Sequence, residues 1–455
     1  MRNTISRTGW LLPLATLALA MPAHAQMQDR DTEIAQAPFT YAPSWTGFYV
    51  GGGLGMAVLN NRIVNNGGGG VVTSIDGAGG QGVLATIYGG VDYQVMPRAL
   101  VGALVEGAYS NAQTQANASI AGVSANISTQ PNWGFAAMMR AGILANPNTL
   151  LYASVGYAGQ NFRTTGNAQA GGAFASFARD DWFNGVTFGT GVEARLSGPW
   201  AAKLEYRYTQ FESRTLSGTG LSYAPSYHTT RVGLTYRFGG LGESAQDSDT
   251  MSAERPVDWT GIYIGGAGGG SVALNRFNAN FGGANASMTD SGQALLGSVF
   301  GGYDWHMSDR AVIGFMGDAT WSGPQSAASM NGTGGGVSLF SRTNFSWSAL
   351  ARVGFLPTRS TLLYAAAGYT GEYVTTTGNA YVGGASADIR RDDYVNGWTV
   401  GPGIETMVSG NWSTRLEYRY SQFEEKQVVQ GASVQPTMHT IRAGLSYKFG
   451  PTPAK

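Results

Sequence analysis

The sequence predicts an all-β chain that crosses a membrane as antiparallel strands, and three observations lead to this prediction. Charged residues make up 12% of the 455 residues, about half the usual share, and 68 residues are glycine. Beyond the first 25 residues, no apolar run approaches the roughly 18 residues that a membrane helix requires. Apolar side chains instead recur at every second position in many segments, as they do in a transmembrane β-barrel.

The stretch 204–208 shows this alternation most clearly. It reads Leu-Glu-Tyr-Arg-Tyr, so a strand here places aliphatic and aromatic side chains on one face and charged side chains on the other. The same five residues return at 416–420, a shift of 212 positions (416 − 204). An apolar face opposite a face of alternating charge is typical of a strand between lipid and a polar interior.

The N-terminal segment is typical of a secretory signal peptide. Two arginines precede an apolar run at residues 10–20, and an Ala-His-Ala motif follows at 23–25. We therefore expect residues 1–25 to be a signal peptide and residues 26–43 to be a flexible lead-in.

Eight segments with strand periodicity follow, most of them about long enough to cross a membrane at a tilt. The connections after the second, fourth and sixth segments are short Pro-containing turns, whereas the other connections are long. This alternation is typical of outer-membrane barrels, which have short periplasmic turns and long extracellular loops. The expected strands are residues 47–59, 82–95, 99–113, 131–145, 149–163, 182–196, 200–213 and 226–238.

The whole pattern occurs twice. The opening motif at 45–52 returns at 259–266, and the closing motif at 231–238 returns at 442–449. The small, acidic segment 240–257 between the two copies is interpreted as a linker. We therefore predict a tandem duplication. Its parts are a first eight-stranded β-barrel at 44–239, a second eight-stranded β-barrel at 258–450 and a short tail at 451–455.

Sixteen strands could also close as one large barrel with a water-filled channel. A tight turn would then be enough between the eighth and ninth strands, whereas a linker of this length can extend about 60 Å. The alternating signs of the inward charges also suit pairing across a narrow lumen. The sequence therefore favours two barrels and leaves one sixteen-stranded barrel as the alternative.

The charged residues within the strands fall on the face opposite the apolar residues. An Arg on the lipid face near the midplane would cost roughly 2–4 kcal/mol, so we expect these side chains to point inward. An eight-stranded barrel is just wide enough for side chains to fill it, so acids and bases can pair across the lumen and leave no open pore. The predicted lumen charge network comprises Glu106, Arg140, Glu193, Lys203, Glu205, Arg207, Arg231, Asp318, Arg352, Glu405, Arg415, Glu417, Arg419 and Arg442.

The residues themselves indicate no catalysis and no bound cofactor. The chain has no Cys and four scattered His, so neither thiol chemistry nor a metal site is expected. His228 and His439 lie at equivalent places in the two copies, and with the Asp pairs at 180–181 and 392–393 they are expected near the outer rim. No nucleophile motif accompanies them. The formal net charge is +0, so nucleic acid is not an expected partner.

Three motifs carry a resemblance to a known family. They are Trp-Thr-Gly-Phe-Tyr-Val-Gly-Gly at 45–52, Glu-Tyr-Arg-Tyr at 205–208 and the closing segment at 228–238. Together they resemble the OmpA-like outer-membrane β-barrel superfamily, and within it the porin-family surface antigens of alpha-proteobacteria. The resemblance covers nearly all of both copies, although members are usually single barrels. It implies an eight-stranded barrel in the Gram-negative outer membrane and no catalytic residues.

We therefore expect an outer-membrane surface protein with a structural or surface-interaction role and at most weak porin activity. The alternative is a general diffusion porin built as one large barrel. The expected partners are outer-membrane lipid, the barrel-assembly machinery and periplasmic chaperones, and small hydrophilic solutes if a weak pore exists. No enzyme activity and no cofactor are expected.

Overall fold

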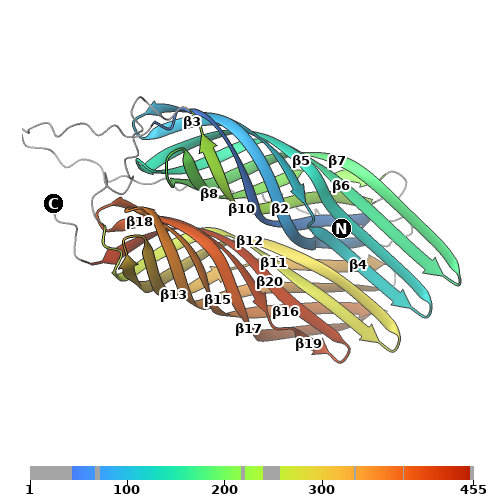
Figure 1. Cartoon of the computed structure of the whole chain (residues 1–455). Helices are drawn as coiled ribbons and strands as arrows, with labels where there is room; N and C mark the ends of the chain where they lie inside the picture. Colours follow the sequence, from blue (N-terminus) through green and yellow to red (C-terminus); the bar gives the residue numbers. More distant parts are fainter. Residues whose placement is uncertain are drawn as a thin grey trace, which may run out of the picture. The chain divides into compact units, whose positions relative to one another are not determined.

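The computed structural model describes residues 44–66, 72–216, 221–238, 257–332, 335–382 and 384–450. Almost all of them lie in antiparallel strands (Figure 1). The predicted signal peptide, lead-in and tail lie outside the described residues, as does the predicted linker apart from Val257. No helix in the described part of the chain has the length and apolar character needed to span a membrane.

The first half forms a closed ring of eight long strands. Neighbouring strands are antiparallel, and β10 returns to pair with β1, from Tyr49↔Arg237 to Asn65↔Leu221. The ring order is β1, β2, β3, β5, β6, β7, β8, β10. The strands are β1 (Gly47–Asn66), β2 (Val72–Met96), β3 (Ala99–Ser110), β4 (Gln113–Ile120), β5 (Val123–Asn146), β6 (Thr149–Ala170), β7 (Ala173–Arg195), β8 (Trp200–Phe211), β9 (Arg214–Leu216) and β10 (Leu221–Arg237).

The second half repeats this arrangement. Its last strand returns to its first, from Ile262↔Phe449 to Ala279↔Ala432. The strands are β11 (Gly261–Phe281), β12 (Ala284–Ser308), β13 (Ala311–Ser322), β14 (Gln325–Gly332), β15 (Gly335–Thr358), β16 (Thr361–Val382), β17 (Ala385–Ser409), β18 (Trp412–Phe423), β19 (Lys426–Val429) and β20 (Ala432–Phe449).

These pairings distinguish the two predicted architectures. A single ring of sixteen strands would place β10 beside β11. Among the described strands, however, β10 pairs with β1, β8 and β9, and β11 pairs with β12 and β20. The fold is therefore two eight-stranded barrels, and the sixteen-stranded alternative does not describe the ring closure.

The outer surface of each barrel has an apolar band between two groups of aromatic residues. Ile87, Leu54 and Met139 are each more than 70% exposed, which in water would be unusual for large apolar side chains. Near the short turns, Trp200 packs against Tyr236 with ring centroids 5.2 Å apart. Farther along the strands lie further exposed aromatic residues, including Trp133. Aromatic groups flanking an apolar band are typical of a barrel surface in contact with lipid.

The strands extend beyond their predicted ends on the side opposite the short turns. The sequence indicated a Gly/Asn-rich loop after residue 59, but β1 runs to Asn66 and β2 starts at Val72. Gly and Asn are poor strand formers. They are held in strands here because each extension finds a partner for its backbone N–H and C=O groups.

Some of these partners come from the other half of the chain. β4 pairs with β12, including Asn117↔Ser287, and β14 pairs with β2, including Ser329↔Ser74. The two junctions are equivalent, because β14 is the repeat of β4 and β12 is the repeat of β2. Beyond the apolar band, each half therefore contributes strands to a sheet that continues into the other half, and the repeats are joined by β-pairing.

The barrels also contact each other through their outer faces. The Thr149 and Thr361 hydroxyl oxygens, one repeat apart in sequence, lie 2.8 Å from each other. His228 Nε2 lies 2.6 Å from Gln293 Oε1, and His439 Nε2 lies 2.7 Å from Gln81 Oε1. Reciprocal contacts between equivalent residues define an isologous interface, so the single chain is arranged like a two-fold dimer.

Replacing Leu234 tests which face meets lipid. The side chain is 52% exposed on the outer face of β10, so Leu234→Arg places a charge in the apolar band. We expect a loss of roughly 2–4 kcal/mol in folding free energy, measured by denaturant titration in lipid vesicles. The Leu234→Met control should change stability by less than about 1.5 kcal/mol. Equal loss in both variants would contradict the assignment of this face to lipid.

Candidate functional sites in the lumen and on the outer face

Near the short turns, the lumen of the first barrel holds a ring of two acids and two arginines. Arg140 donates from Nε to Asp92 Oδ1 at 2.8 Å and from Nη1 to Glu193 Oε2 at 3.2 Å. Arg237 Nη2 lies 2.8 Å from Asp92 Oδ2 and 2.9 Å from Glu193 Oε1. Each acid contacts both arginines, so all four buried charges are compensated.

A second cluster lies above this ring. Arg207 and Arg231 both pair with Glu106, with Arg207 Nη1 at 2.8 Å from Oε1. Glu205 also pairs with Arg207, and its Oε2 accepts a hydrogen bond from the Tyr152 hydroxyl at 2.5 Å. Lys203 Nζ lies 3.5 Å from Glu205 Oε2. Strands on several sides of the barrel supply these groups, so the cluster spans the lumen.

The second barrel repeats both clusters with changed side-chain lengths. In its lower cluster, Arg352 donates to Asp304 and Glu405, and Lys448 takes the place of Arg237 with Nζ 2.6 Å from Asp304 Oδ2. In its upper cluster, Asp318 replaces Glu106 and pairs with Arg419 and Arg442. Glu417 pairs with Arg419, and Arg415 Nη2 lies 3.6 Å from Glu405 Oε2. The pattern of charge persists although individual side chains differ.

A buried Trp covers the short-turn end of each lumen. The Trp45 indole donates from Nε1 to the Pro147 carbonyl at 2.9 Å, and the guanidinium of Arg237 lies 4.4 Å from the ring centroid. Trp259 donates to the Arg359 carbonyl in the same way, at 2.9 Å. The indole N–H thus fixes each ring against a turn, and the ring covers the lower ion cluster.

The structure places all fourteen predicted network residues in the barrel interiors, each less than 10% exposed. Sequence reasoning missed Asp92 and Asp304, which link the arginines of the lower clusters. It also missed the covering residues Trp45 and Trp259. The signal for the two acids was available, since both lie on a predicted strand in the Gly-Gly-x-Asp motif that occurs in each copy.

The expected outer-rim position of the two histidines is wrong. His228 and His439 are buried at the contact between the barrels, where Nδ1 of each meets a Tyr hydroxyl at 2.7 Å. The Asp pairs lie instead on the exposed outer parts of β7 and β17. The histidines face outward as their position in the strand requires, but the other barrel covers this part of the outer face.

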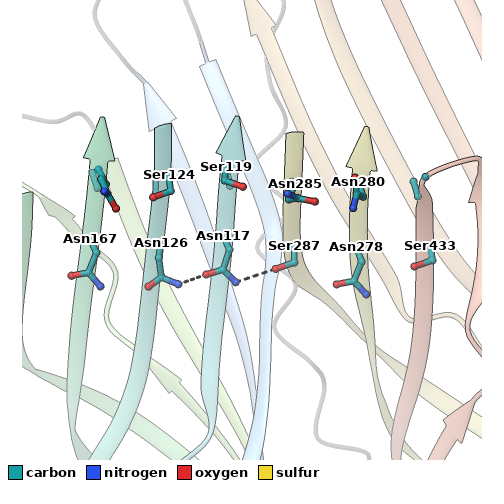
Figure 2. Close-up of a pocket in the computed structure, with 18 of the residues that line it drawn as sticks. Asn117, Ser119, Ser124, Asn126, Asn167, Asn278, Asn280, Asn285, Ser287 and Ser433 are labelled. Atoms are coloured by element: carbon teal, nitrogen blue, oxygen red, sulfur yellow. Dashed lines mark hydrogen bonds between the residues drawn. The ribbon is translucent and has the colours of Figure 1, made fainter. Parts of the chain in front are cut away.

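The outer face of the β4–β12 junction carries a row of amide and hydroxyl side chains. Figure 2 shows them side by side on neighbouring strands, one residue from each. Strand register aligns Asn167 (β6), Asn126 (β5), Asn117 (β4), Ser287 (β12), Asn278 (β11) and Ser433 (β20). Within this row, the Asn126 amide donates to Asn117, and Asn117 Nδ2 donates to Ser287 Oγ at 3.0 Å. Both halves of the chain contribute to the row.

A second row runs parallel to the first, nearer the strand ends. It consists of Gln169, Ser124, Ser119, Asn285 and Asn280, again aligned by register. The two rows form the floor of a groove that encloses about 780 Å³. No residue that lines this groove carries a charge. The groove is therefore polar and neutral, unlike the lumens.

One acid is buried near the junction without an ionic partner among the described residues. Asp290, in the part of β12 beyond the apolar band, is 5% exposed and faces Ala78 of β2 in the register. Burial raises the pKa of the Asp290 carboxyl to about 6, and hydrogen bonds from Ser326 and Asn275 oppose this effect. Burial therefore disfavours the charged form of this carboxyl.

Arg140→Met tests whether the lower cluster holds the first barrel together. The substitution leaves Asp92 and Glu193 with one cation between them, and breaking a buried ion pair typically costs about 3–5 kcal/mol. We expect the free energy of unfolding in detergent micelles to fall by about that amount. Arg98→Met, at an exposed turn position, is the control and should have little effect. Equal stability of the two variants would show that the cluster is dispensable.

Comparison with known proteins supports the fold. A family model described as "Outer membrane protein beta-barrel domain" matches residues 12–238 and again 250–449. The "31 kDa outer-membrane immunogenic protein" of Brucella melitensis is 26% identical over 229 residues, covering 45% of this chain and 94% of that protein. The "22 kDa outer membrane protein" of Rhizobium leguminosarum is 31% identical over 182 residues, covering 38% and 70%.

Among solved structures, Neisserial surface protein A matches with 16% identity over 42% of this chain and 98% of its own, with a TM-score of 0.23. The Pseudomonas putida toluene transporter TodX matches with 10% identity over 89% and 90%, with a TM-score of 0.25. The named relatives are outer-membrane proteins, and the family model matches both halves of the chain. The chain belongs to the outer membrane protein β-barrel domain family, as a tandem duplication, and resides in the Gram-negative outer membrane.

Proposed function

We propose that this protein is a surface-presenting envelope protein, with two barrels that anchor it in the outer membrane and outer sheets that serve a structural or interaction role. The observation that carries the proposal is the filled lumen. In each barrel, paired charges from strands around the ring meet across the interior, and a Trp covers the short-turn end. Side chains therefore occupy the path that a diffusing solute would need.

The exposed apolar band supports outer-membrane lipid as the first partner, since it meets no other described part of the chain. Insertion of such strands would employ the barrel-assembly machinery after delivery by periplasmic chaperones. Both barrels begin and end near their short turns. At their starts, the Trp45 and Trp259 indoles donate to turn carbonyls. At their ends, the backbone N–H groups of Arg237 and Lys448 donate to the carbonyls of Pro199 and Asn411. An even number of strands in each barrel makes this possible.

Weak porin activity is the second candidate, and one observation favours it. In the upper cluster of the first barrel, Glu106 Oε2, Arg207 Nη2 and Arg231 Nε are buried without a hydrogen-bond partner among the described residues. Buried polar atoms of this kind are often satisfied by water. A thin file of water through the cluster would pass small ions at a low rate.

Single-channel recording in planar bilayers tests the proposal. We expect the refolded chain to be silent or to show only rare openings well below one nanosiemens. Trp45→Ala combined with Trp259→Ala removes both covering rings and should increase the frequency of small openings. Trp200→Ala combined with Trp412→Ala removes exposed surface Trp residues at equivalent positions and should not.

Folding of every variant is first verified by the heat-modifiable gel shift. Stable steps of nanosiemens size from the unmodified chain would contradict the proposal and support a general diffusion porin. Identical recordings from the two Trp pairs would show that the covering rings do not limit the path.

A further inference from the structure

We propose that the groove on the outer face of the β4–β12 junction binds a neutral carbohydrate chain. The proposal depends on the proposed function only in placing this end of the strands outside the cell. The site is formed by the two rows of amide and hydroxyl side chains, and the contributions from β4–β6 and from β11, β12 and β20 make it a product of the duplication.

The location of the groove follows from side-chain alternation. Asn167 shares its face of β6 with Tyr157, and Asn278 shares its face of β11 with Ile264; both partners are exposed in the apolar band. The rows therefore continue the outward face of each barrel beyond the lipid. The outer surface of a barrel is convex, so the concave part arises where the walls of two barrels meet at β4 and β12. A single barrel of the same sequence would lack it.

The chemistry of the rows matches the hydroxyl groups of sugars. Each Asn side chain offers two donor hydrogens and an acceptor oxygen, and each Ser hydroxyl offers both functions. No hydrogen bond of the side-chain amides of Asn278, Asn280 or Asn285 occurs among the described residues, so these amides remain available to a ligand. Neighbouring strands lie about 4.8 Å apart, so the six-residue row presents evenly spaced groups over about 24 Å. Such a row suits an extended chain of hexose units.

The same features argue against other classes of ligand. The groove contains no Lys or Arg for phosphate, sulfate or nucleic acid, and no carboxylate for a cation. Its one large apolar side chain, Phe174, offers too little area to hold a hydrocarbon ligand, but it can pack against one sugar face. A peptide cannot add as a further strand here, because β4 and β12 are already paired with each other.

The test measures binding of fluorescently labelled neutral oligosaccharides to the full chain in lipid nanodiscs. One arm uses the delipidated polysaccharide of the producing cell, and a second arm uses neutral glucan and mannan oligosaccharides from other sources. Asn278→Ala combined with Asn280→Ala removes two unpartnered amides and should weaken binding about tenfold or more. Asn344→Ala, which removes an exposed amide on β15 far from these rows in the sequence, is the control and should bind as the unmodified chain does.

Binding in either arm that the groove variant loses and the control retains supports the proposal, and the arm identifies the source of the glycan. Absence of binding in both arms, equal binding by all variants, or binding of only sulfated glycans or of peptides would overturn it. The gel shift shows that each variant is folded. This test measures binding, whereas the test of the proposed function measures conductance. Either prediction can therefore fail without changing how the other result is interpreted.

Discussion

Compensation of charge inside a narrow barrel is the constraint on which the structure depends. Closing eight strands brings the inward faces so near one another that every inward side chain has to pack or pair. Arg140 illustrates the consequence, because it contacts Asp92 from β2 and Glu193 from β7 at once. The inward charges thus couple strands that share no backbone hydrogen bonds, and they fill much of the lumen. The apolar outer band follows, since the charges of the membrane-spanning parts of the strands lie in the interior.

The duplication adds an interface between the two barrels. The outward faces that a lone barrel would expose to lipid are partly covered here, with Leu204 and Leu416 buried in one apolar cluster that both halves share. The polar contacts in this interface are reciprocal, as the two His–Gln pairs show. Each buried imidazole has one partner from its own barrel, a Tyr hydroxyl, and one from the other barrel, a Gln side chain. The same symmetry places β-pairing at two equivalent junctions and produces the outer groove.

Much of the membrane part could be predicted from local sequence. Strict alternation in segments such as 204–208 assigns each side chain to lumen or lipid, because the side-chain period of a strand is fixed. Asp92 was missed because it is a single acid in a Gly-rich segment, and its role becomes apparent only when Arg140 and Arg237 meet it across the ring. Trp45 precedes its strand, so alternation says nothing about where its ring lies. His228 was misplaced because its burial depends on a neighbouring barrel, which no local sequence pattern encodes.

The outer part was harder to predict for a different reason. Segments rich in Gly, Asn and Ser have low strand propensity, and the sequence indicated loops. They form strands because partners exist, some of them about 170 residues away, such as Asn117 and Ser287. Register between two repeats is a tertiary property. The composition of these segments did indicate one property of the surface. They are rich in Asn, Ser and Gly and poor in charged residues, so any groove they form is neutral.

Disulfide trapping of the ring closure tests the central claim most directly, and the chain has no native Cys to interfere. Leu54 and Val232 are register partners on β1 and β10, so Leu54→Cys with Val232→Cys should oxidise readily. Val50→Cys with Tyr447→Cys joins β1 to β20, as one sixteen-stranded ring would require, and should remain reduced. A protease site in the linker then reports the outcome on a non-reducing gel. Loss of free thiols in the first variant agrees with two self-closed barrels, whereas halves held together by a disulfide in the second variant would contradict them.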